Sequence, residues 1–403
     1  MSVLSNKRIL LGVTGSIAAY KAADLASKLA QAGAQVDVIL TSAAEKFITP
    51  LTFQSVTGRR AYTDSDLWGD EAHVLHVGLG HNADLLVIAP CTANTLAKLV
   101  YGQADSLLTV TALAATCPLV VAPAMDGGMY DHAATQENLE TLKKRGAHII
   151  EPGEGHLASG LTGKGRLPET PDLIGHIRVV LGRGGLLADR KVIVTAGGTQ
   201  EPLDPVRVLT NKSSGKQGYA LAQAAVDAGA QVILITTPVS LTPPVDARVV
   251  HVQTAKQMLE AVAKESSNAD VLVMAAAVAD FRPRNQAKDK IKKNGAVPQV
   301  EFEATEDILK AVSSQRGGAK RPRVLVGFAA ESRDLLENAS SKLESKGLDM
   351  IAANDISAGD AGFAVENNRV TLLFADGRKE SLPLMSKTEV AETMVERIAK
   401  LLE

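Results

Sequence analysis

The chain has 403 residues, of which 45% are hydrophobic and 22% charged, with a formal net charge of −2. This length favours two domains, and the near-neutral charge together with an aromatic content of 3% argues against a nucleic-acid-binding protein. The two cysteines, Cys91 and Cys117, lie in apolar segments, so we expect no disulfide framework and a reducing compartment. Apolar runs stay short of the ~18–20 residues that a membrane span needs, and no signal peptide is recognisable. We therefore expect a cytoplasmic protein that binds neither nucleic acid nor membrane.

Both halves of the chain open with the same order of predicted elements. Residues 7–44 read as an apolar strand, a glycine turn, an alanine-rich helix, the sequence Ala-Gly-Ala-Gln-Val and a second apolar strand, and residues 190–238 repeat this order. The glycine after each helix, Gly33 or Gly229, suits a C-cap with positive φ. Because the strands are continuously apolar, they indicate parallel sheets that helices cover on both faces.

A second repeated feature supports a division into two domains. An Ala-Asp pair leads into a further buried strand at residues 83–90 and again at 269–277. The glycine-rich segment 181–191 interrupts the pattern just before the second opening strand. We predict an α/β protein with two Rossmann-like domains and mostly parallel sheets, covering residues 1–185 and 189–403.

The first strand is followed by a Gly-Ser turn, Gly15-Ser16, and then by a helix. Free backbone N–H groups and the positive end of a helix favour a phosphate there, although a tight turn without a ligand is an equal alternative. The turn matches neither G-x-G-x-x-G nor a Walker A motif, which argues against a dinucleotide site. Small hydroxyl side chains in residues 41–44 and 105–109 are predicted at other strand ends, where open α/β sheets bind ligands. A mononucleotide such as a flavin phosphate would suit these three places.

Three histidines, His73, His76 and His81, lie close together before the strand at 83–90. Their spacing does not match a metal-ligand set. A catalytic base, a recognition residue or a plain surface histidine all remain possible.

The glycine-rich stretch 153–169 is predicted to contain no regular helix or strand. Its small polar residues, with Lys164 and Arg166, suit an anionic ligand. A flexible connector is the alternative, but long glycine-rich loops are more often functional.

Several features of the second half favour a nucleoside triphosphate. Residues 213–215 precede a helix whose free N–H groups can hold an anion, and a buried strand leads to Asp280. Residues 282–299 contain six basic residues and one acidic residue and are predicted to be a mobile loop. Lys342 and Lys346 form an i, i+4 pair, which in many proteins simply faces solvent.

Together these stretches resemble the bifunctional phosphopantothenoylcysteine decarboxylase/phosphopantothenate–cysteine ligase family of coenzyme A biosynthesis. The ligase motifs are QEPLDPVRVLTNKSSGKQG, AAVADF, KIKK, GFAAES and DMIAANDIS, and the first half resembles FMN-dependent cysteine decarboxylases through GVTGSIAAYK, APCTANTLAKLVYGQADSLLT and PAMDGGMY. The resemblance implies CTP-dependent ligation of 4′-phosphopantothenate with cysteine through an acyl-CMP intermediate. It further implies FMN-dependent decarboxylation of phosphopantothenoylcysteine to 4′-phosphopantetheine. It also implies Mg²⁺, with unspecified ligands, and a homo-oligomer with flavin-domain trimers or a dodecamer and ligase-domain dimers.

The resemblance also assigns residues. The family's active-site histidine stands eight residues before Asp84, which selects His76. The FMN contacts implied are Gly15, Ser16, Thr41, Ser42, Thr92, Ser106, Leu107, Leu108, Thr109 and Met125. In the ligase half, Asn211 and Lys290 are implied in catalysis. The nucleotide or substrate contacts implied are Arg207, Ser213, Ser214, Gly215, Lys216, Ala275, Ala276, Asp280, Asp307, Ile308, Phe328, Lys342 and Lys346.

Two catalytic positions depart from the usual family pattern. Asp126 stands where an asparagine normally binds the substrate carboxylate, so a protonated Asp126 or a changed binding mode is required. Ser159 stands where a cysteine normally donates a proton, and serine is the weaker acid. Either this is a working variant in which Asp126 supplies the proton, or the flavin half is impaired and mainly supports oligomerisation beside an active ligase.

Two other classes of protein deserve comparison with this assignment. One is a flavin-binding regulatory protein, against which the intact ligase motifs argue. The other is a Rossmann dehydrogenase, against which the missing G-x-G-x-x-G argues.

Overall fold

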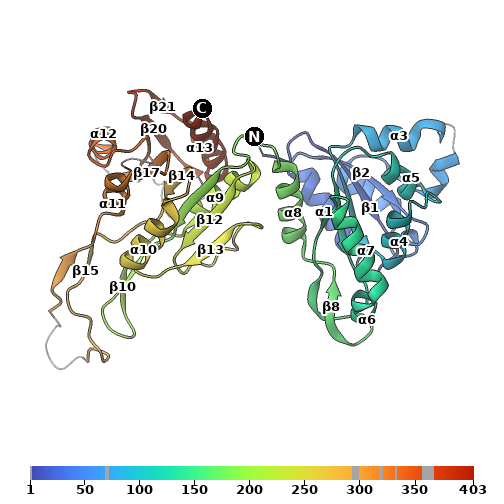
Figure 1. Cartoon of the computed structure of the whole chain (residues 1–403), viewed down its shortest axis with the longest axis horizontal. Helices are drawn as coiled ribbons and strands as arrows, with labels where there is room; N and C mark the ends of the chain where they lie inside the picture. Colours follow the sequence, from blue (N-terminus) through green and yellow to red (C-terminus); the bar gives the residue numbers. More distant parts are fainter. Residues whose placement is uncertain (1, 69–71, 293–298, 317–320, 332–333, 356–366) are drawn as a thin grey trace. The chain divides into compact units, whose positions relative to one another are not determined.

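The computed structural model describes residues 2–68, 72–292, 299–316, 321–331, 334–355 and 367–403. The chain divides into two compact units, Ser2–Gly182 (the first unit) and Arg183–Glu403 (the second unit) (Figure 1). Within the described ranges, no helix is both long and apolar enough to cross a membrane.

The first unit is built on a parallel sheet with the strand order β3-β2-β1-β4-β5-β6. Its strands are β1 (Arg8–Val13), β2 (Gln35–Leu40), β3 (Ala61–Tyr62), β4 (Leu85–Cys91), β5 (Leu119–Pro123) and β6 (His148–Ile149). Each neighbouring pair is parallel, so the predicted fold class is confirmed for this unit.

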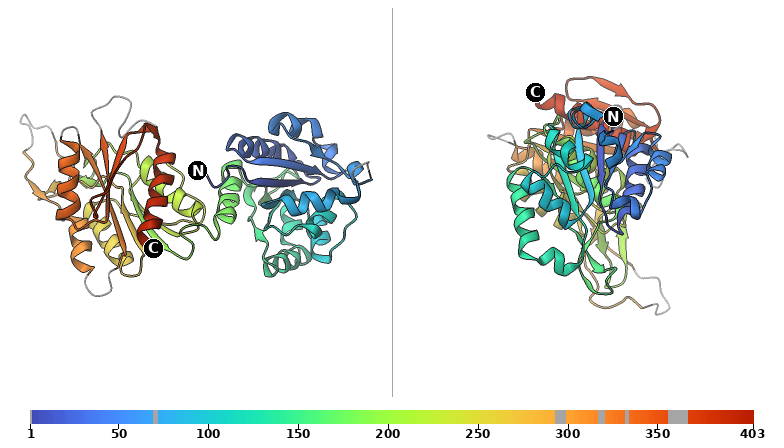
Figure 2. Two further views of the ribbon diagram at one scale, coloured as in Figure 1. Left: turned by 90° about the horizontal axis from the view of Figure 1, so that it is seen from above. Right: turned by 90° about the vertical axis from the view of Figure 1, so that its right-hand side faces the viewer.

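Helices cover both faces of this sheet (Figure 2). They are α1 (Ala19–Gln31), α2 (Pro50–Thr57), α3 (Ala72–Asn82), α4 (Ala93–Tyr101), α5 (Leu107–Ala114), α6 (Gly127–Asp131), α7 (Ala133–Lys144) and α8 (Thr170–Gly182), with short helical turns η1 (Ala44–Lys46) and η2 (Asp64–Trp68). Along β1, Ile9 and Leu11 belong to one core cluster with residues of α1, α2 and α8, whereas Leu10 belongs to a second cluster with residues of α4, α5 and α7. Successive strand residues therefore enter opposite layers, which explains why the strands are apolar throughout.

The glycine-rich stretch 153–169 is an antiparallel hairpin, so the prediction of no regular element there was wrong. Its strands are β7 (Gly153–His156) and β8 (Thr162–Arg166), and it lies beside α6 (Figure 1). A β-carbon on Gly165, whose φ is +150°, would collide with the backbone carbonyl of Met125. A glycine-rich stretch can still form this hairpin, because a strand ladder uses backbone groups and not side chains. The missing side chains let the hairpin pack closely against the loop after β5.

The second unit contains a larger mixed sheet with the order β13-β12-β9-β14-β17-β18-β20-β21. Its strands are β9 (Lys191–Ala196), β12 (Gln231–Thr236), β13 (Arg248–His251), β14 (Val271–Met274), β17 (Val324–Glu331), β18 (Met350–Asp355), β20 (Val370–Phe374) and β21 (Lys379–Ser381). The pairs from β13 to β18 are parallel, and β20 and β21 pair antiparallel at one edge, which confirms a mostly parallel sheet.

Helices again lie on both faces. They are α9 (Lys216–Asp227), α10 (Ala255–Ser266), α11 (Ile308–Gln315), α12 (Leu335–Ser345) and α13 (Lys387–Leu402). Residues of α10, α11 and α12 share a core cluster with the sheet, while α9 packs against α13 and β9.

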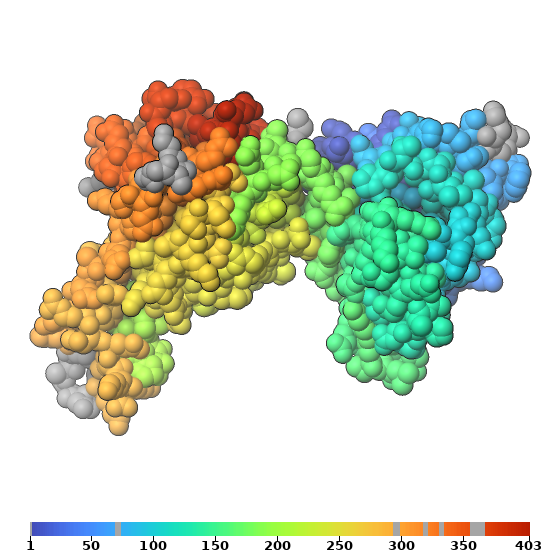
Figure 3. All heavy atoms as spheres, in the orientation of Figure 1, coloured from blue at the N-terminus to red at the C-terminus, as the bar shows by residue number. Residues whose placement is uncertain are grey.

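Three small antiparallel pairs complete the second unit. They are β10 (Gln200–Pro202) with β11 (Val208–Thr210), β15 (Phe281–Pro283) with β16 (Phe302–Ala304), and β19 (Asn367–Asn368) with β22 (Met385–Ser386). The segment around β15 projects from the body of its unit, in orange at the lower left of Figure 3. The basic segment predicted to be a mobile loop begins inside β15, and its residues 293–298 lie outside the described residues.

The Ala-Asp pair repeated in the sequence has the same structural role in both units. Oδ2 of Asp84 accepts a hydrogen bond from the backbone N–H of Arg8 at 2.8 Å, and Oδ2 of Asp270 accepts one from that of Lys191 at 2.9 Å. Asp84 stands just before β4 and fixes the start of the neighbouring strand β1. Asp270 stands just before β14 and fixes the start of the neighbouring strand β9.

Candidate active sites

The first unit has a cavity of about 470 Å³ at the carboxyl ends of β1, β4 and β5 (the first cavity). This is where open parallel sheets bind ligands. The predicted site residues among its lining are Gly15, Ser16, Thr92, Met125, Asp126 and Ser159. Residues from four distant parts of the sequence therefore meet in one place.

The turn after β1 is held to the end of β4. The hydroxyl of Thr14 donates to the carbonyl of Pro90 at 2.7 Å and accepts from the N–H of Thr92 at 3.0 Å. The Ala18 side chain does not cap α1, but Oγ of Ser16 accepts from the N–H of Ala18 at 3.3 Å and the carbonyl of Ser16 accepts from the N–H of Ala19 at 3.0 Å. An anion at this helix start would use the remaining N–H groups of the turn. A β-carbon on Gly15 would come within 2.5 Å of the β-carbon of Ala43, so only glycine fits this close approach.

Asp64, which the sequence analysis missed, connects two of the predicted stretches. Its Oδ2 accepts hydrogen bonds from the backbone N–H and hydroxyl of Ser42, and its Oδ1 accepts one from the N–H of Leu107. An isolated aspartate in a short helical turn gave no signal in the sequence.

The segment Ser106–Thr109 was expected at a strand end, and that expectation was wrong. It forms the start of α5, where Ser106 and Thr109 make a capping box. The side chains of Leu107 and Leu108 are buried in the core, so only their backbone can contact a ligand. Thr41, Ser42 and this segment are not among the residues that line the first cavity.

The two residues that depart from the family pattern are hydrogen-bonded to each other. The Ser159 hydroxyl donates to Oδ2 of Asp126 at 2.6 Å, and the N–H of Gly128 donates to Oδ1 at 3.0 Å. The bond from Ser159, and after it the backbone N–H of Gly128, lowers the pKa of the Asp126 carboxyl. In this arrangement these bonds favour the ionised form of Asp126.

His76 lies on α3 and does not line the first cavity. Its Nδ1 is buried and has no hydrogen-bond partner within the part of the chain that the structure describes. His81 is exposed, and the side chain of His73 lies outside the described residues.

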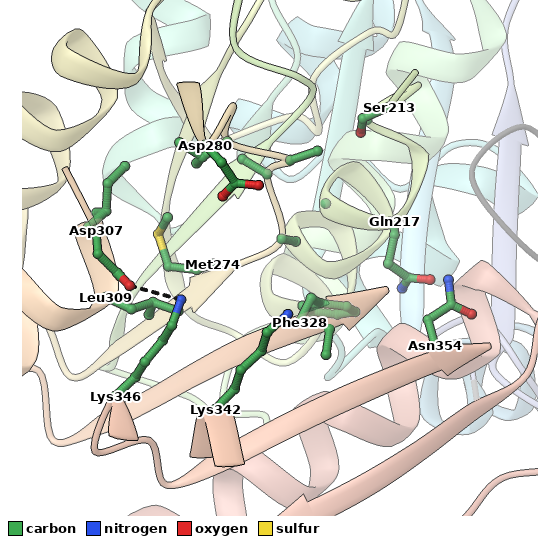
Figure 4. A pocket seen from close by; sticks show the side chains of 18 of the residues that line it. Ser213, Gln217, Met274, Asp280, Asp307, Leu309, Phe328, Lys342, Lys346 and Asn354 are labelled. Carbon is green, nitrogen blue, oxygen red and sulfur yellow. Dashed lines mark ion pairs between the residues drawn. The ribbon is translucent and has the colours of Figure 1, made fainter. Parts of the chain in front are cut away.

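The second unit has a cavity of about 390 Å³ (the second cavity), formed by the ends of β14, β17 and β18 and the starts of α9 and α11 (Figure 4). The predicted residues that line it are Ser213, Ser214, Gly215, Lys216, Ala275, Ala276, Asp280, Asp307, Ile308, Phe328, Lys342 and Lys346. Nζ of Lys346 lies 3.0 Å from Oδ2 of Asp307. Burial acts to raise the pKa of Asp307, but the N–H of Lys310 and the ammonium of Lys346 outweigh it and lower that pKa.

Arg207, Asn211 and Lys290 are not among the residues that line this cavity. Nδ2 of Asn211 donates to the carbonyls of Ala277 and Val278, which do line it, so Asn211 borders the cavity. Lys290 is exposed on the segment after β15.

The loop that carries Arg207 is held by Asp204, a residue that the sequence analysis quoted in a motif without a role. The buried carboxylate of Asp204 accepts from the N–H groups of Val206, Arg207 and Ile291. Burial acts to raise its pKa, but these three hydrogen bonds outweigh it and lower that pKa. Asp204 therefore ties the Arg207 loop to the segment that follows Lys290.

Among the lining residues that were also missed as site residues are Gln217, Asn354, Asn368 and Lys387. Asn354 lies in the quoted motif DMIAANDIS, but an asparagine in a buried strand signals neither a particular ligand nor a direction for its side chain.

The fold and the two cavities define a two-domain α/β enzyme with a separate site at the strand ends of each domain. The model of the family described as Flavoprotein matches residues 2–182, and that of the DNA/pantothenate metabolism flavoprotein C-terminal domain matches residues 187–402. The coenzyme A biosynthesis bifunctional protein CoaBC of Bacillus subtilis is 45% identical over 99% of this chain and 98% of its own length. The protein of that name from Mycobacterium tuberculosis is 44% identical over 98% of this chain and 97% of its own.

A solved structure of the C-terminal domain of a coenzyme A biosynthesis bifunctional protein CoaBC is 40% identical, covers 54% of this chain and 98% of that chain, and has a TM-score of 0.46. From the sequence relatives, the chain belongs to the family of coenzyme A biosynthesis bifunctional proteins CoaBC. It is an enzyme with a flavoprotein domain.

Proposed function

We propose that the second unit joins 4′-phosphopantothenate to cysteine with CTP. The observation that carries this proposal is a single cavity in which the start of α9, the carboxylate of Asp280 and two lysines of the α12 region face one another. Backbone N–H groups and ammonium groups suit a triphosphate, and a carboxylate suits a ribose hydroxyl or Mg²⁺. The described residues contain no group of three or more metal-ligating side chains, so Mg²⁺ would depend on the nucleotide's own phosphates together with Asp280.

The reaction has two balanced steps. A carboxylate oxygen of 4′-phosphopantothenate attacks the α-phosphorus of CTP, and pyrophosphate leaves. The nitrogen of cysteine then attacks the carbonyl carbon of the acyl phosphate, the C–O bond breaks, CMP leaves and the nitrogen loses a proton. Lys342 and Lys346 offset the charge of the phosphates, and Asn211 is placed to hold the intermediate from the border of the cavity. Arg207 and Lys290 lie outside the lining, which is consistent with a ligase-domain dimer that completes the site.

For the first unit, we propose FMN-dependent decarboxylation of phosphopantothenoylcysteine. The residues fit the cofactor because the tight Gly15 turn before α1 and the hydroxyl of Thr92 offer donors to a phosphate at the positive end of that helix. When bound, FMN supplies the two-electron oxidation and the later reduction that let the substrate sulfur accept the electron pair released with CO₂. The protein must hold the substrate, exclude water and deliver one proton to carbon.

Of the two alternatives for the flavin half, we propose the working variant. Asp126 and Ser159 form a hydrogen-bonded pair inside the cavity, whereas residues without a role would have no reason to keep this geometry. An anionic substrate beside Asp126 raises the pKa of its carboxyl, because two negative charges then share one site. Asp126 can thus take up a proton as the substrate binds and pass it to carbon, while Ser159 holds its carboxyl in position. Lys21 and Arg166 line the same cavity, where Nζ of Lys21 lies 2.7 Å from Oε1 of Glu169 and the guanidinium of Arg166 lies 3.7 Å from it, so a substrate carboxylate would compete with Glu169 for them.

The position of His76 bears on the oligomer. Since His76 does not line the first cavity of its own chain, a role in that cavity requires a second copy to bring it there. This supports the proposal of flavin-domain trimers or a dodecamer.

The test is to give the purified protein 4′-phosphopantothenate, CTP, Mg²⁺ and carboxyl-labelled cysteine, and to measure CMP and labelled CO₂ separately. We expect both products. CMP without CO₂ would mean an active ligase fused to an impaired flavin unit, and the absence of CMP would contradict the ligase proposal.

A further inference from the structure

Two buried amide oxygens of the second cavity have no hydrogen-bond donor in the described parts of the chain. They are Oδ1 of Asn354, near the end of β18, and Oδ1 of Asn368, in β19. The two residues are 8% and 2% exposed, and both line the cavity. Because buried amide oxygens are normally paired, this pair marks a place where a ligand supplies the donors.

The orientation of the Asn368 amide follows from its neighbours. The carbonyl of Lys387 can only accept, so the Gln217 amide must present Nε2 to it, at 3.2 Å. Oε1 of Gln217 is then the atom that faces Asn368, and it must receive Nδ2 of Asn368, at 2.8 Å. Oδ1 of Asn368 is therefore the free atom, and a flipped amide would break this chain of bonds.

The two acceptors lie in the part of the cavity near the start of α9, since Asn368 bonds to Gln217 in the first turn of that helix. In Figure 4, the amides of Gln217 and Asn354 lie on one side of Phe328, and the ion pair of Lys346 with Asp307 lies on the other. Asn354 thus lies across Phe328 from the ion pair of Lys346 with Asp307.

We propose that Asn354 and Asn368 form the amine subsite of the ligase: their side-chain oxygens accept hydrogen bonds from the amino group of the amino-acid substrate. This inference rests on the proposed ligase function. Nδ2 of Asn368 donates to Gln217 and its Oδ1 is free to accept, so a group that brings donors fits better there than a nucleobase edge, which alternates donors and acceptors. Two N–H groups held by two oxygens leave the nitrogen lone pair free to attack the activated carboxylate.

The experiment uses the full-length variants Asn354→Leu and Asn368→Leu, which remove the acceptor at nearly constant volume. We expect the KM for cysteine to rise about tenfold in each, as for the loss of one buried hydrogen bond. The KM for CTP should not change. Pyrophosphate release from CTP and 4′-phosphopantothenate, with hydroxylamine as the trapping nucleophile in place of cysteine, should also keep its wild-type rate.

Two controls separate this role from a structural one. Asn367→Leu changes the exposed neighbour of Asn368 on the same short strand and should leave every constant unchanged. Asn354→Asp keeps an oxygen acceptor and should raise the KM for cysteine less than the leucine variant does. If the Asn354→Leu variant has a lower melting temperature than the wild type, the Asn354→Asp variant allows the KM for cysteine to be compared in a folded protein.

Three outcomes would overturn the proposal. An unchanged KM for cysteine in both leucine variants would mean that the two side-chain oxygens do not bind the amino group of cysteine. A raised KM for CTP with slower pyrophosphate release would assign them to the nucleotide. Wild-type protein that releases no pyrophosphate would overturn the proposed ligase function, and the amine subsite with it.

Discussion

At the scale of single residues, Asp126 poses the sharpest chemical question. Its charge lies in a cavity proposed to receive a carboxylate, and its hydrogen bonds with Ser159 and the N–H of Gly128 favour that charge. The site can work only if substrate binding changes the protonation of Asp126 or if the substrate carboxylate is held away from it.

This reasoning predicts the behaviour of two variants. Asp126→Asn removes the proposed proton donor, so the release of labelled CO₂ from phosphopantothenoylcysteine should fall about 100-fold. Asp126→Asn combined with Ser159→Cys restores the usual pair of the family and should recover most of this loss. The rate of CMP formation and the flavin absorbance are the controls, and both should match the wild type. Wild-type CO₂ release by Asp126→Asn alone would exclude Asp126 as the donor.

Asp270 gives a residue-scale prediction for stability. Its buried carboxylate bonds to the N–H of Lys191 and to Arg321 at 2.6 Å, and although burial acts to raise its pKa, these partners lower it. Asp270→Ala should therefore destabilise the second unit by roughly 2 kcal/mol at pH 7. Since the folded pKa is depressed, this contribution is present above the unfolded pKa of about 3.9 and is lost as the pH falls through the folded value.

Hydrogen exchange would be measured for peptides that contain β9 and β14, once at pH 7 and once at pH 3 after equilibration in urea. The difference between the wild type and Asp270→Ala should shrink at the lower pH. Asp84→Ala is the matched variant in the first unit, and because Asp84 is more exposed, its effect should be smaller. Equal losses at both pH values would show that the alanine acts through packing instead of charge.

At the scale of elements, the β7–β8 hairpin controls the position of the loop that carries Asp126. The N–H of Met125 donates to the carbonyl of Gly165, and Gly165 has no room for a side chain. Lys164 of β8 binds Glu151 at 2.8 Å, and Glu151 also accepts from the hydroxyl of Tyr130. The hairpin and α6 are thus fixed to each other on both sides of Asp126.

Gly165→Ala should therefore displace Met125 and Asp126 and lower the decarboxylation rate by at least about tenfold, because the new β-carbon meets backbone atoms that cannot give way. Gly163→Ala is the matched control on the same strand, since a β-carbon there would make only ordinary contact with Leu157. Rates of CO₂ release and of CMP formation would be measured for both. Similar CO₂ rates in the two variants would contradict a positioning role for the hairpin.

These elements also show how far the sequence leads. The repeated opening strands and the Ala-Asp pairs predicted the two sheets because a buried parallel strand needs apolar residues at every position. The hairpin could not be predicted, since its pairing depends on the backbone of a loop distant in the sequence. Most predicted ligase residues share a cavity because motifs at strand ends meet at one edge of a sheet. The directions of Asn354 and Asn368 depend on neighbours that only the fold brings together.

At the scale of the whole molecule, the two units carry separate cavities, each lined by residues of one unit only. The product of the proposed ligase is the substrate of the proposed decarboxylase. Nothing in the chemistry of either cavity requires both reactions to occur on one chain.

We therefore predict that two defective variants complement each other in a mixture. Asp126→Asn should make phosphopantothenoylcysteine but decarboxylate it slowly, and Asp280→Ala should decarboxylate it but fail to make it. Each alone should release little labelled CO₂ from carboxyl-labelled cysteine, whereas the mixture should release it after a lag. If the mixture stays inactive while Asp280→Ala decarboxylates added phosphopantothenoylcysteine, the intermediate must pass between the units of one chain.

The serine at position 159 has a consequence for the conditions under which the enzyme can work. The chain's two thiols lie elsewhere: Cys91 is buried, Cys117 is partly buried, and burial raises the pKa of both. A catalytic thiol would be open to oxidation or alkylation, whereas a hydroxyl paired with a carboxylate is inert to both. Neither cysteine lines the first cavity, so we expect no thiol there through which iodoacetamide could inactivate the decarboxylase.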